Sequence, residues 1–309
     1  MPLVFILSLF FIEDKKYAGL SVMLFAANSN ILINAVSGYS ESLFTLIFLT
    51  MGWMTLQLRK QKKTARILLF VFAILWAWLY YIKPEGLLTG GIFFLWIVLA
   101  DRTQDYLTWI VPIIVLILVF PYMYFLKEHT GRWQLSGKTY ANLVMGELNS
   151  PYQTGIDNRT KDDRYYINDR TASNPTLSYG FASYWYEKEN DILLRIPVNV
   201  VKWIKTYWQT FSIIGIVLGV WGIVSLKRQS SYFLITLMAP MAAYMIFFVL
   251  PRTIAMYHWI WIVFLMYGLK DLSFFIESKW KISYTDSLIW TAAILIAVYQ
   301  MRDAIKLII

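Results

Sequence analysis

The sequence contains no cysteine and only two histidines, His129 and His258, which lie far apart in the chain. Disulfides and thiolate metal sites are therefore excluded, and a histidine-rich metal site is not expected. Charge is scarce as well, because only 15% of the 309 residues are charged while 58% are hydrophobic. Soluble domains of this size do not normally have so apolar a composition. The sequence therefore predicts an integral membrane protein.

The positive charge of the chain, formally +9, is concentrated in clusters that follow apolar segments. One is the basic run from Arg59 to Arg66, and another is Lys227 with Arg228. Such clusters are typical of the cytoplasmic loops of membrane proteins. We therefore interpret the charge as a sign of membrane topology, with membrane lipids as partners, and we predict no nucleic-acid partner.

The apolar segments predict an all-α fold, a polytopic transmembrane helix bundle of about 9 to 10 spans. The expected spans are Tyr17–Val36, Ser42–Leu58, Ile67–Ile82, Leu87–Ala100, Leu107–Leu126, Thr210–Leu226, Tyr232–Leu250, Met256–Leu269 and Ser287–Met301. An additional first stretch, Pro2–Ile12, is too short to span a bilayer unless residues upstream complete it. We therefore expect either a chain truncated at its start or a partly inserted helix there.

A polar, tyrosine-rich region after the fifth expected span divides the chain into three parts. We predict an N-terminal transmembrane bundle over residues 1–126, an extracytoplasmic loop domain of mixed or irregular structure over 127–208, and a C-terminal bundle over 209–309. The loop domain is expected to end in an amphipathic helix, Ile192–Trp208, that lies on the membrane surface.

Alternation of the loops assigns the unusual charged residues to one side of the membrane. If the basic run after Arg59 is cytoplasmic, the loops at 15–16, 101–105, 227–228 and 270–281 are cytoplasmic as well. Glu41, the turn Lys83-Pro84-Glu85-Gly86, the large polar region and Arg252 then fall outside. All the candidate chemistry is therefore predicted on the non-cytoplasmic face.

The acids best placed for chemistry are Glu41 and Glu85. Glu41, in G-Y-S-E-S-L-F, is the only acid between Asp14 and Glu85, and a lone acid at the mouth of a membrane helix is costly without water, a partner or a function. It could instead cap a helix N-terminus. The proline and glycine around Glu85 predict a tight hairpin. Lys83 in that hairpin either reaches lipid headgroups and pairs with Glu85, or binds a lipid-linked phosphate.

Further candidate ligands lie in the second half of the chain. Lys138 ends the segment T-G-R-W-Q-L-S-G-K, which is rich in glycine and cations, and Arg252 lies between two expected spans. Both could bind phosphate, with an ordinary interfacial role as the alternative. Tyr184 and Trp185 could contact a sugar or acceptor, or belong to an interfacial aromatic belt. His258 is a further possible contact, although we favour an interfacial or bundle role over that of a base.

No cofactor is predicted. Four aspartates between residues 157 and 169 could bind a divalent ion, so a metal stays open as an alternative. Lysine and arginine alternate with these aspartates, which favours a solvated, salt-bridged loop.

Four short motifs resemble, in their order and spacing, the GT-C class of multi-spanning membrane glycosyltransferases. They are Y-S-E-S-L-F at 39–44, K-P-E-G-L-L at 83–88, T-G-R-W-Q-L-S-G-K at 130–138 and R-T-I-A-M-Y-H-W at 252–259. The resemblance covers about residues 28 to 270. It is closest to bacterial family 39-like proteins, the group related to protein mannosyltransferases and lipid A aminoarabinose transferases.

The resemblance implies transfer of a sugar from a polyprenyl-phosphate donor to a lipid, glycan or protein acceptor. It places the reaction at the outer face of a bacterial cytoplasmic membrane. It also implies that Lys83, Lys138 and Arg252 bind the donor's phosphate, with supporting roles for Glu41 and Glu85. In such an enzyme a carboxylate deprotonates the acceptor hydroxyl while cations stabilise the departing lipid phosphate.

The chain departs from this family's pattern at three places. Relatives usually have R-P-E-G where this chain has Lys83, and a tyrosine where it has Thr253. Relatives also have an N-terminal external loop with an acidic motif that supplies the catalytic base, and nothing here matches it. The catalytic residue is therefore unassigned, and two alternatives stay open: an N-terminally truncated form of such an enzyme, or a chain that lacks the catalytic loop and is inactive or depends on a partner.

Two other classes of protein stay open. An O-antigen ligase or polymerase-like enzyme would also combine a large external loop with cations. A non-catalytic transporter or scaffold would explain Asn28, Asn30 and Asn34 inside an apolar segment without any contact to a lipid phosphate.

Overall fold

The computed structural model describes residues 1–38, 40–60, 65–100, 106–131, 133–136, 181–246, 251–280 and 285–308. Within these ranges every regular element is a helix, which confirms the predicted all-α class for this part of the chain. Most of the predicted loop domain, residues 137–180, lies outside the described residues. Its mixed or irregular structure, and the three-part division of the chain, stay predictions.

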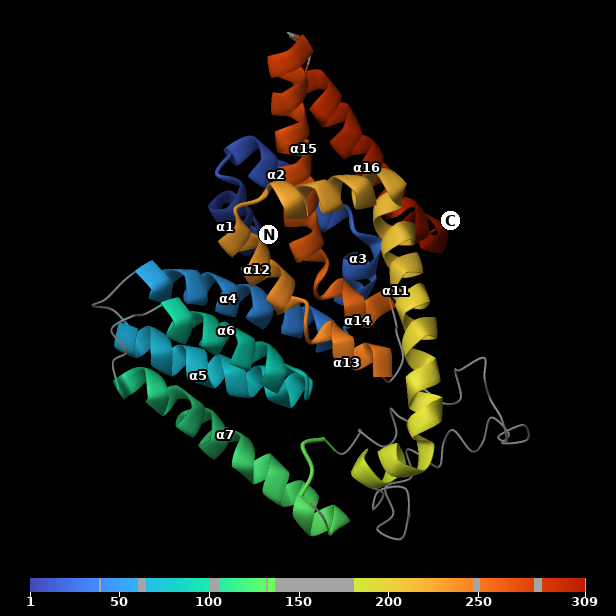
Figure 1. Cartoon of the computed structure of the whole chain (residues 1–309). Coiled ribbons are helices and arrows are strands. Elements are labelled where there is room, and N and C mark those ends of the chain that lie inside the picture. The colour runs from blue at the N-terminus through green and yellow to red at the C-terminus, as the bar shows by residue number, and fades with distance from the viewer. Residues whose placement is uncertain are drawn as a thin grey trace, which may run out of the picture.

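Two groups of helices make up the fold (Figure 1). In one group α4 (Ser40–Lys60), α5 (Ala65–Ile82), α6 (Gly86–Ala100) and α7 (Tyr106–Thr130) lie side by side. The other group contains α1 (Pro2–Ile12), α2 (Lys15–Ala27), α11 (Phe181–Ser225), α15 (His258–Trp280) and α16 (Thr285–Ile308). The short helices between them are α3 (Ser29–Val36), α12 (Arg228–Leu237), α13 (Met241–Ile246) and α14 (Pro251–Ala255).

Aromatic side chains fill the junction of the two groups. The ring centroid of Phe48 on α4 lies 5.3 Å from that of Phe93 on α6 and 5.7 Å from that of Trp259 on α15. All three side chains are fully buried. In lipid, close packing of this kind holds helices together, because removal from water contributes little between membrane helices. The two groups therefore share one core.

Four helices in the described ranges are long and apolar enough to cross a membrane, or five if the bent pair α2 and α3 counts as one span. The four are Ser40–Arg59, Leu107–His129, Leu193–Ser225 and His258–Lys279. Apolar side chains cover the outside of α7, where Leu116 and Ile117 expose 61% and 65% of their surface. Soluble monomers rarely leave large contiguous apolar patches uncovered. These features support an integral membrane protein.

Other expected spans correspond to shorter helices. Arg66–Ile82, Gly86–Leu99 and Ile289–Arg302 are apolar but have fewer than 18 described residues. The expected span Tyr232–Leu250 is interrupted, since α12 ends at Leu237 and α13 begins at Met241. Pro240, which lacks a backbone N–H, lies in that interruption. The total of nine to ten spans therefore stays a prediction.

The predicted surface helix Ile192–Trp208 and the span that was expected after it form one helix. α11 is one helix from Phe181 to Ser225, and it continues through Pro197. Figure 1 shows that its last part changes direction, and Ser212 has a left-handed φ of 62°. A separate surface helix is therefore replaced by one long, bent helix whose apolar part begins at Leu193.

The expected helix Tyr17–Val36 is broken at Asn28, where α2 and α3 meet at an angle of 57°. Asn28 has an extended backbone, and its side-chain oxygen accepts a hydrogen bond from the backbone N–H of Ile31, at 3.3 Å. Asparagine favours such capping positions over helix interiors, because its side chain competes for backbone hydrogen bonds. The side-chain amide nitrogen of Asn28 also lies 3.1 Å from Nδ1 of His258 on α15, so a hydrogen bond connects the break between α2 and α3 to α15.

Replacement of Asn28 by alanine is expected to destabilise the protein by about 2 kcal/mol. The change removes a helix cap, at about 1 kcal/mol, and leaves a buried His258 nitrogen without this hydrogen bond. Asn28→Ser retains a capping oxygen but cannot reach His258, so it should lose roughly half as much. Thermal unfolding in detergent, followed by circular dichroism, measures both. Equal loss in the two variants would assign the whole effect to the hydrogen bond with His258.

Candidate functional site

The turn between α5 and α6 sets the position of two charged side chains. α5 ends at Ile82, and the backbone N–H of Gly86 donates to the carbonyl oxygen of Lys83, at 2.8 Å. A side chain at Gly86 would overlap the backbone of Leu79, so this position requires glycine. The sequence prediction of a tight hairpin is confirmed. The hairpin places Lys83 and Glu85 at the same end of the first helix group as the start of α4.

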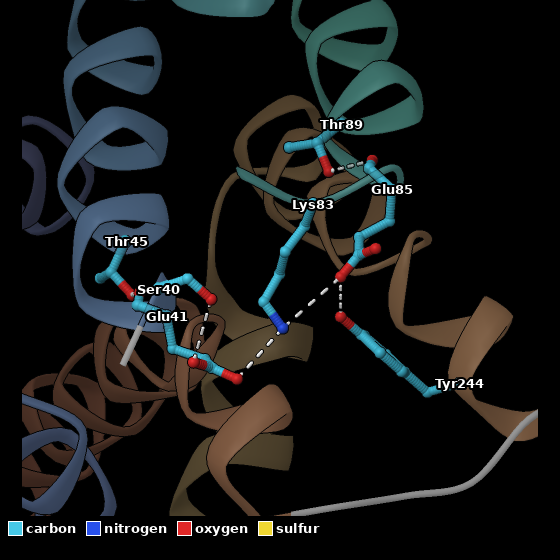
Figure 2. Close-up of polar contacts among 7 residues, drawn as sticks. All are labelled: Ser40, Glu41, Thr45, Lys83, Glu85, Thr89 and Tyr244. Carbon is cyan, nitrogen blue, oxygen red and sulfur yellow. Dashed lines mark hydrogen bonds and ion pairs between the residues drawn. The ribbon is translucent and has the colours of Figure 1, made fainter. Parts of the chain in front are cut away.

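Glu41 lies in the first turn of α4, close to that hairpin (Figure 2). Its carboxylate oxygen Oε1 is 3.1 Å from Nζ of Lys83, and only 6% of its side-chain surface is exposed. The hydroxyl of Ser40 donates to the other carboxylate oxygen, at 3.4 Å. Both sequence interpretations of Glu41 therefore hold in part: its charge lies at a helix N-terminus, where it suits the dipole, and it also has a partner.

Glu85 is the second partner of Lys83. Its Oε1 lies 3.9 Å from Nζ, and its side chain is 16% exposed, against 14% for Lys83. The hydroxyl of Tyr244 on α13 donates to the same oxygen (Figure 2). We call Glu41, Lys83, Glu85 and Tyr244 the polar cluster. It joins α4, the hairpin and α13, which lie far apart in the sequence, and the low exposure of its side chains strengthens each of its interactions.

The polar cluster carries a formal charge of −1 when both of its carboxyl groups are ionised, because one ammonium faces two carboxylates. Lys83 is therefore already paired with two anionic side chains. Any phosphate that approached it would need further cations nearby to offset the carboxylates. Lys83 lies between the two carboxylates and offsets part of their charge.

The third sequence motif approaches the same end of the molecule. α7 ends at Thr130, and Gly131, the residue after it, has a left-handed φ of 71° and donates its N–H to the carbonyl oxygen of Lys127. Glycine is the usual residue for this type of helix termination. The hydroxyl of Tyr80 on α5 then donates to the carbonyl oxygen of Leu135, at 2.6 Å. Tyr80 lies one turn before Lys83, so Leu135, in the segment that leads to Lys138, lies near the hairpin. Lys138 itself lies outside the described residues.

Arg252 belongs to α14, which packs on α3 and α4. The backbone of this helix is therefore close to α4, the helix that carries Glu41 in its first turn, and the side chain of Arg252 lies outside the described part. Tyr184 and Trp185 lie near the start of α11, and their side chains are outside the described part as well. The structure thus packs the helix that carries Arg252 against α4, and it leaves the two aromatic contacts as predictions.

His258 lies in the core rather than at this site. Its side chain is fully buried, its Nδ1 faces the Asn28 amide, and its ring is 5.1 Å from that of Phe211. This geometry favours the bundle role considered for it from the sequence. A contact with sugar or acceptor stays a prediction that would require the core to open.

The charged residues expected on the cytoplasmic side form a second group. Nζ of Lys227 lies 2.7 Å from Oε1 of Glu13, and Lys270 donates to the carbonyl oxygen of Ile12, at 2.6 Å. The hydrogen bond and the charge of Lys227 lower the pKa of Glu13. The loops that alternation assigns to one side thus contact each other, while Glu41 contacts the Lys83 hairpin. This pairing agrees with the alternation, although which side faces the cytoplasm stays a prediction.

One member of the polar cluster was missed from the sequence. Tyr244 lies in an apolar segment and is one of 21 tyrosines, so no spacing linked it to Glu85. Within the described residues, no group of three or more histidine or acidic side chains is arranged to hold a metal ion. The aspartates between 157 and 169 lie outside these residues.

Comparison with known proteins adds no family assignment: no family model, curated protein or solved structure matches the chain.

Proposed function

We propose that this chain is a membrane glycosyltransferase that takes a sugar from a polyprenyl-phosphate donor at the extracytoplasmic face. The observation that supports this best is the contact between Glu41 and Lys83, which joins two of the four motifs that resemble the GT-C class. A bacterial cytoplasmic membrane, nine to ten spans and a lipid, glycan or protein acceptor belong to the same proposal. The catalytic base is not assigned.

In this proposal the polar cluster positions the donor's phosphate. Glu41 and Glu85 hold the Lys83 ammonium at a fixed place, and the phosphate takes over part of its hydrogen bonding when the donor binds. Because the cluster has a formal charge of −1, Arg252 and Lys138 are proposed to supply the remaining positive charge. Cations placed in this way stabilise the charge that develops on the leaving lipid phosphate.

The proposal predicts that removal of the Lys83 charge weakens phosphate recognition. The probe is undecaprenyl phosphate, with undecaprenol as the same lipid without phosphate, bound to the purified full chain in detergent and counted by native mass spectrometry. Lys83→Ala should bind undecaprenyl phosphate about tenfold more weakly, because a charge-assisted hydrogen bond is lost. Lys83→Arg should retain binding, since arginine also binds phosphate. Arg252→Ala should resemble Lys83→Ala.

Two controls make this result specific. Undecaprenol binding should be unchanged in all variants, and Lys279→Ala, which removes an exposed cation at the far end of α15, should behave as wild type. Each variant must also show the wild-type gel-filtration profile. Equal binding of phosphate and alcohol, or no effect of Lys83→Ala and Arg252→Ala in folded protein, would overturn the proposal. Turnover with a matching donor sugar should fall far more than expression in the same variants.

A transporter is the second candidate, and the broken helices favour it. α3 begins at the break at Asn28, and α13 follows the interruption after α12; both lie near the polar cluster. Interrupted membrane helices surround the substrate sites of many secondary transporters. Flux of a solute into vesicles that depends on Glu41 or Glu85, without binding of undecaprenyl phosphate, would favour this candidate.

A further inference from the structure

A pocket of about 250 Å³ lies at the opposite end of α4 from Glu41. Its walls come from α1, α4 and α12. Three phenylalanines form the apolar side, and Arg59, Gln229 and Ser230 form the polar side. The pocket therefore combines one cation with an aromatic surface.

The guanidinium of Arg59 packs on an aromatic ring and has no acidic partner among the described residues. It lies over the ring of Trp96, 5.5 Å from the centroid, and the Trp96 N–H donates to the hydroxyl of Thr236, at 2.7 Å. No carboxylate among the described residues is within ion-pair distance of Arg59, whose side chain is partly buried. A half-buried guanidinium held by one aromatic face still has most of its N–H donors available.

The neighbouring cations, Lys227 and Arg228, both have polar partners. Lys227 pairs with Glu13, and the Nε–H of Arg228 donates to the hydroxyl of Tyr232, at 2.7 Å. Among the residues that line the pocket, Arg59 alone is charged, so the lining has a net positive charge. An anion that entered the pocket would meet Arg59 without competition from an acid in that lining.

The start of α12 adds donors on the facing wall. Lys227 is the N-cap residue and makes no side-chain capping bond, so the first backbone N–H groups of α12 have no cap. Gln229 and Ser230, which line the pocket, belong to this first turn. The partial positive charge of a helix N-terminus adds to that of Arg59.

We infer that this pocket binds the phosphate group of an anionic phospholipid. The guanidinium fork matches phosphate oxygens, and the phenylalanine rings suit the glycerol and the first methylenes of the acyl chains. A zwitterionic lipid is less suited, because the lining offers no carboxylate to its ammonium group. The pocket also lies beside the basic clusters that are expected at the cytoplasmic leaflet, where anionic lipids gather.

The test measures lipid retained by the purified full chain in detergent. The protein is incubated with dioleoyl-phosphatidylglycerol or dioleoyl-phosphatidylcholine, and bound lipid is counted by native mass spectrometry. The wild type should prefer phosphatidylglycerol. Arg59→Gln should weaken phosphatidylglycerol binding about fivefold, the effect of one arginine at an anionic membrane surface, and should leave phosphatidylcholine binding unchanged. Lys279→Gln removes an exposed cation outside the pocket and should have no effect.

A second variant keeps the arginine and fills the space. Ser230 is partly exposed, so Ser230→Phe has little reason to unfold the protein, and it should reduce phosphatidylglycerol binding as Arg59→Gln does. Inorganic phosphate at millimolar concentration should not displace the lipid. Displacement by phosphate that depends on Arg59, without any lipid preference, would overturn the lipid assignment in favour of a soluble phosphate. Unchanged binding in both variants would overturn the site itself. Neither result bears on undecaprenyl phosphate binding that depends on Lys83.

Discussion

Replacement of Lys83 by methionine is expected to lower the free energy of unfolding by about 3 kcal/mol, because it leaves two poorly hydrated carboxylates without their shared partner. Glu41 and Glu85 expose only 6% and 16% of their side chains. Methionine has a similar shape to the lysine stem, so the loss reports charge rather than packing. The same change at an exposed lysine, Lys279→Met, should alter stability by less than about 0.5 kcal/mol.

A second substitution separates the charge interaction from other effects. Glu41→Gln removes one of the two carboxylate charges, so in the Lys83→Met background it should restore stability rather than reduce it further. The coupling energy from the four proteins is expected to be about 1–2 kcal/mol, as for residues in direct contact. Chemical unfolding in detergent, followed by circular dichroism, gives all four values. Additive effects would mean that Lys83 and Glu41 do not interact in solution, whatever their distance in the structure.

This stability result also bears on function. If Lys83 only held Glu41 and Glu85 together, the double variant would be stable and would bind undecaprenyl phosphate as well as the wild type. If Lys83 also contacts the donor, the double variant should be stable but still bind weakly. The structural and the ligand-binding roles of Lys83 are therefore separable in one set of proteins.

The sequence predicts which charged segments lie on the same side of the membrane, but it does not predict which residues contact each other. Alternation of the loops placed Glu41 on the same side as the Lys83 hairpin, and proline and glycine specified the hairpin itself. The contact of Tyr244 with Glu85 could not be inferred, because it spans 159 positions and has no local pattern. Long-range pairs of this kind depend on how helices pack, which hydropathy does not encode.

The helix boundaries could also be predicted only in part from the sequence. Asn28 carries a usable signal, since an asparagine followed by serine and asparagine favours a helix start, yet the apolar residues on both sides suggested one span. In α11 the error is reversed: a shift from amphipathic to apolar composition suggested two helices, while the structure has one helix that continues through Pro197. Composition locates the membrane region, whereas capping residues and breakers determine where each helix ends.

The crossing of α11 and α15 depends on glycines. A Cβ at Gly222 would overlap the carbonyl oxygen of Phe264, and a Cβ at Gly268 would overlap the carbonyl oxygen of Leu218. These atoms belong to the backbone, so they cannot move aside without separation of the two helices. Small residues at such crossings are a general means of bringing membrane helices together.

Gly222→Ala is therefore expected to destabilise the protein by about 3 kcal/mol, at the upper end of the usual cost of overpacking. Gly19→Ala is the matched control, because Gly19 is also helical and a Cβ there meets no atom within 4 Å. That control should be neutral or stabilising by up to about 1 kcal/mol, as alanine favours helix over glycine. Thermal unfolding in detergent compares the two.

The pair Gly222→Ala and Gly268→Ala tests whether the crossing acts as one unit. Either substitution alone forces α11 and α15 apart, and once they have separated the second methyl group finds space already made. The double variant should therefore lose less stability than the two single losses together. Fully additive losses, or a Gly222→Ala variant that unfolds with Gly19→Ala, would mean that the helices do not approach through these glycines. Because Asn28 on the α2–α3 break faces His258 at the start of α15, separation at the crossing should also weaken that hydrogen bond.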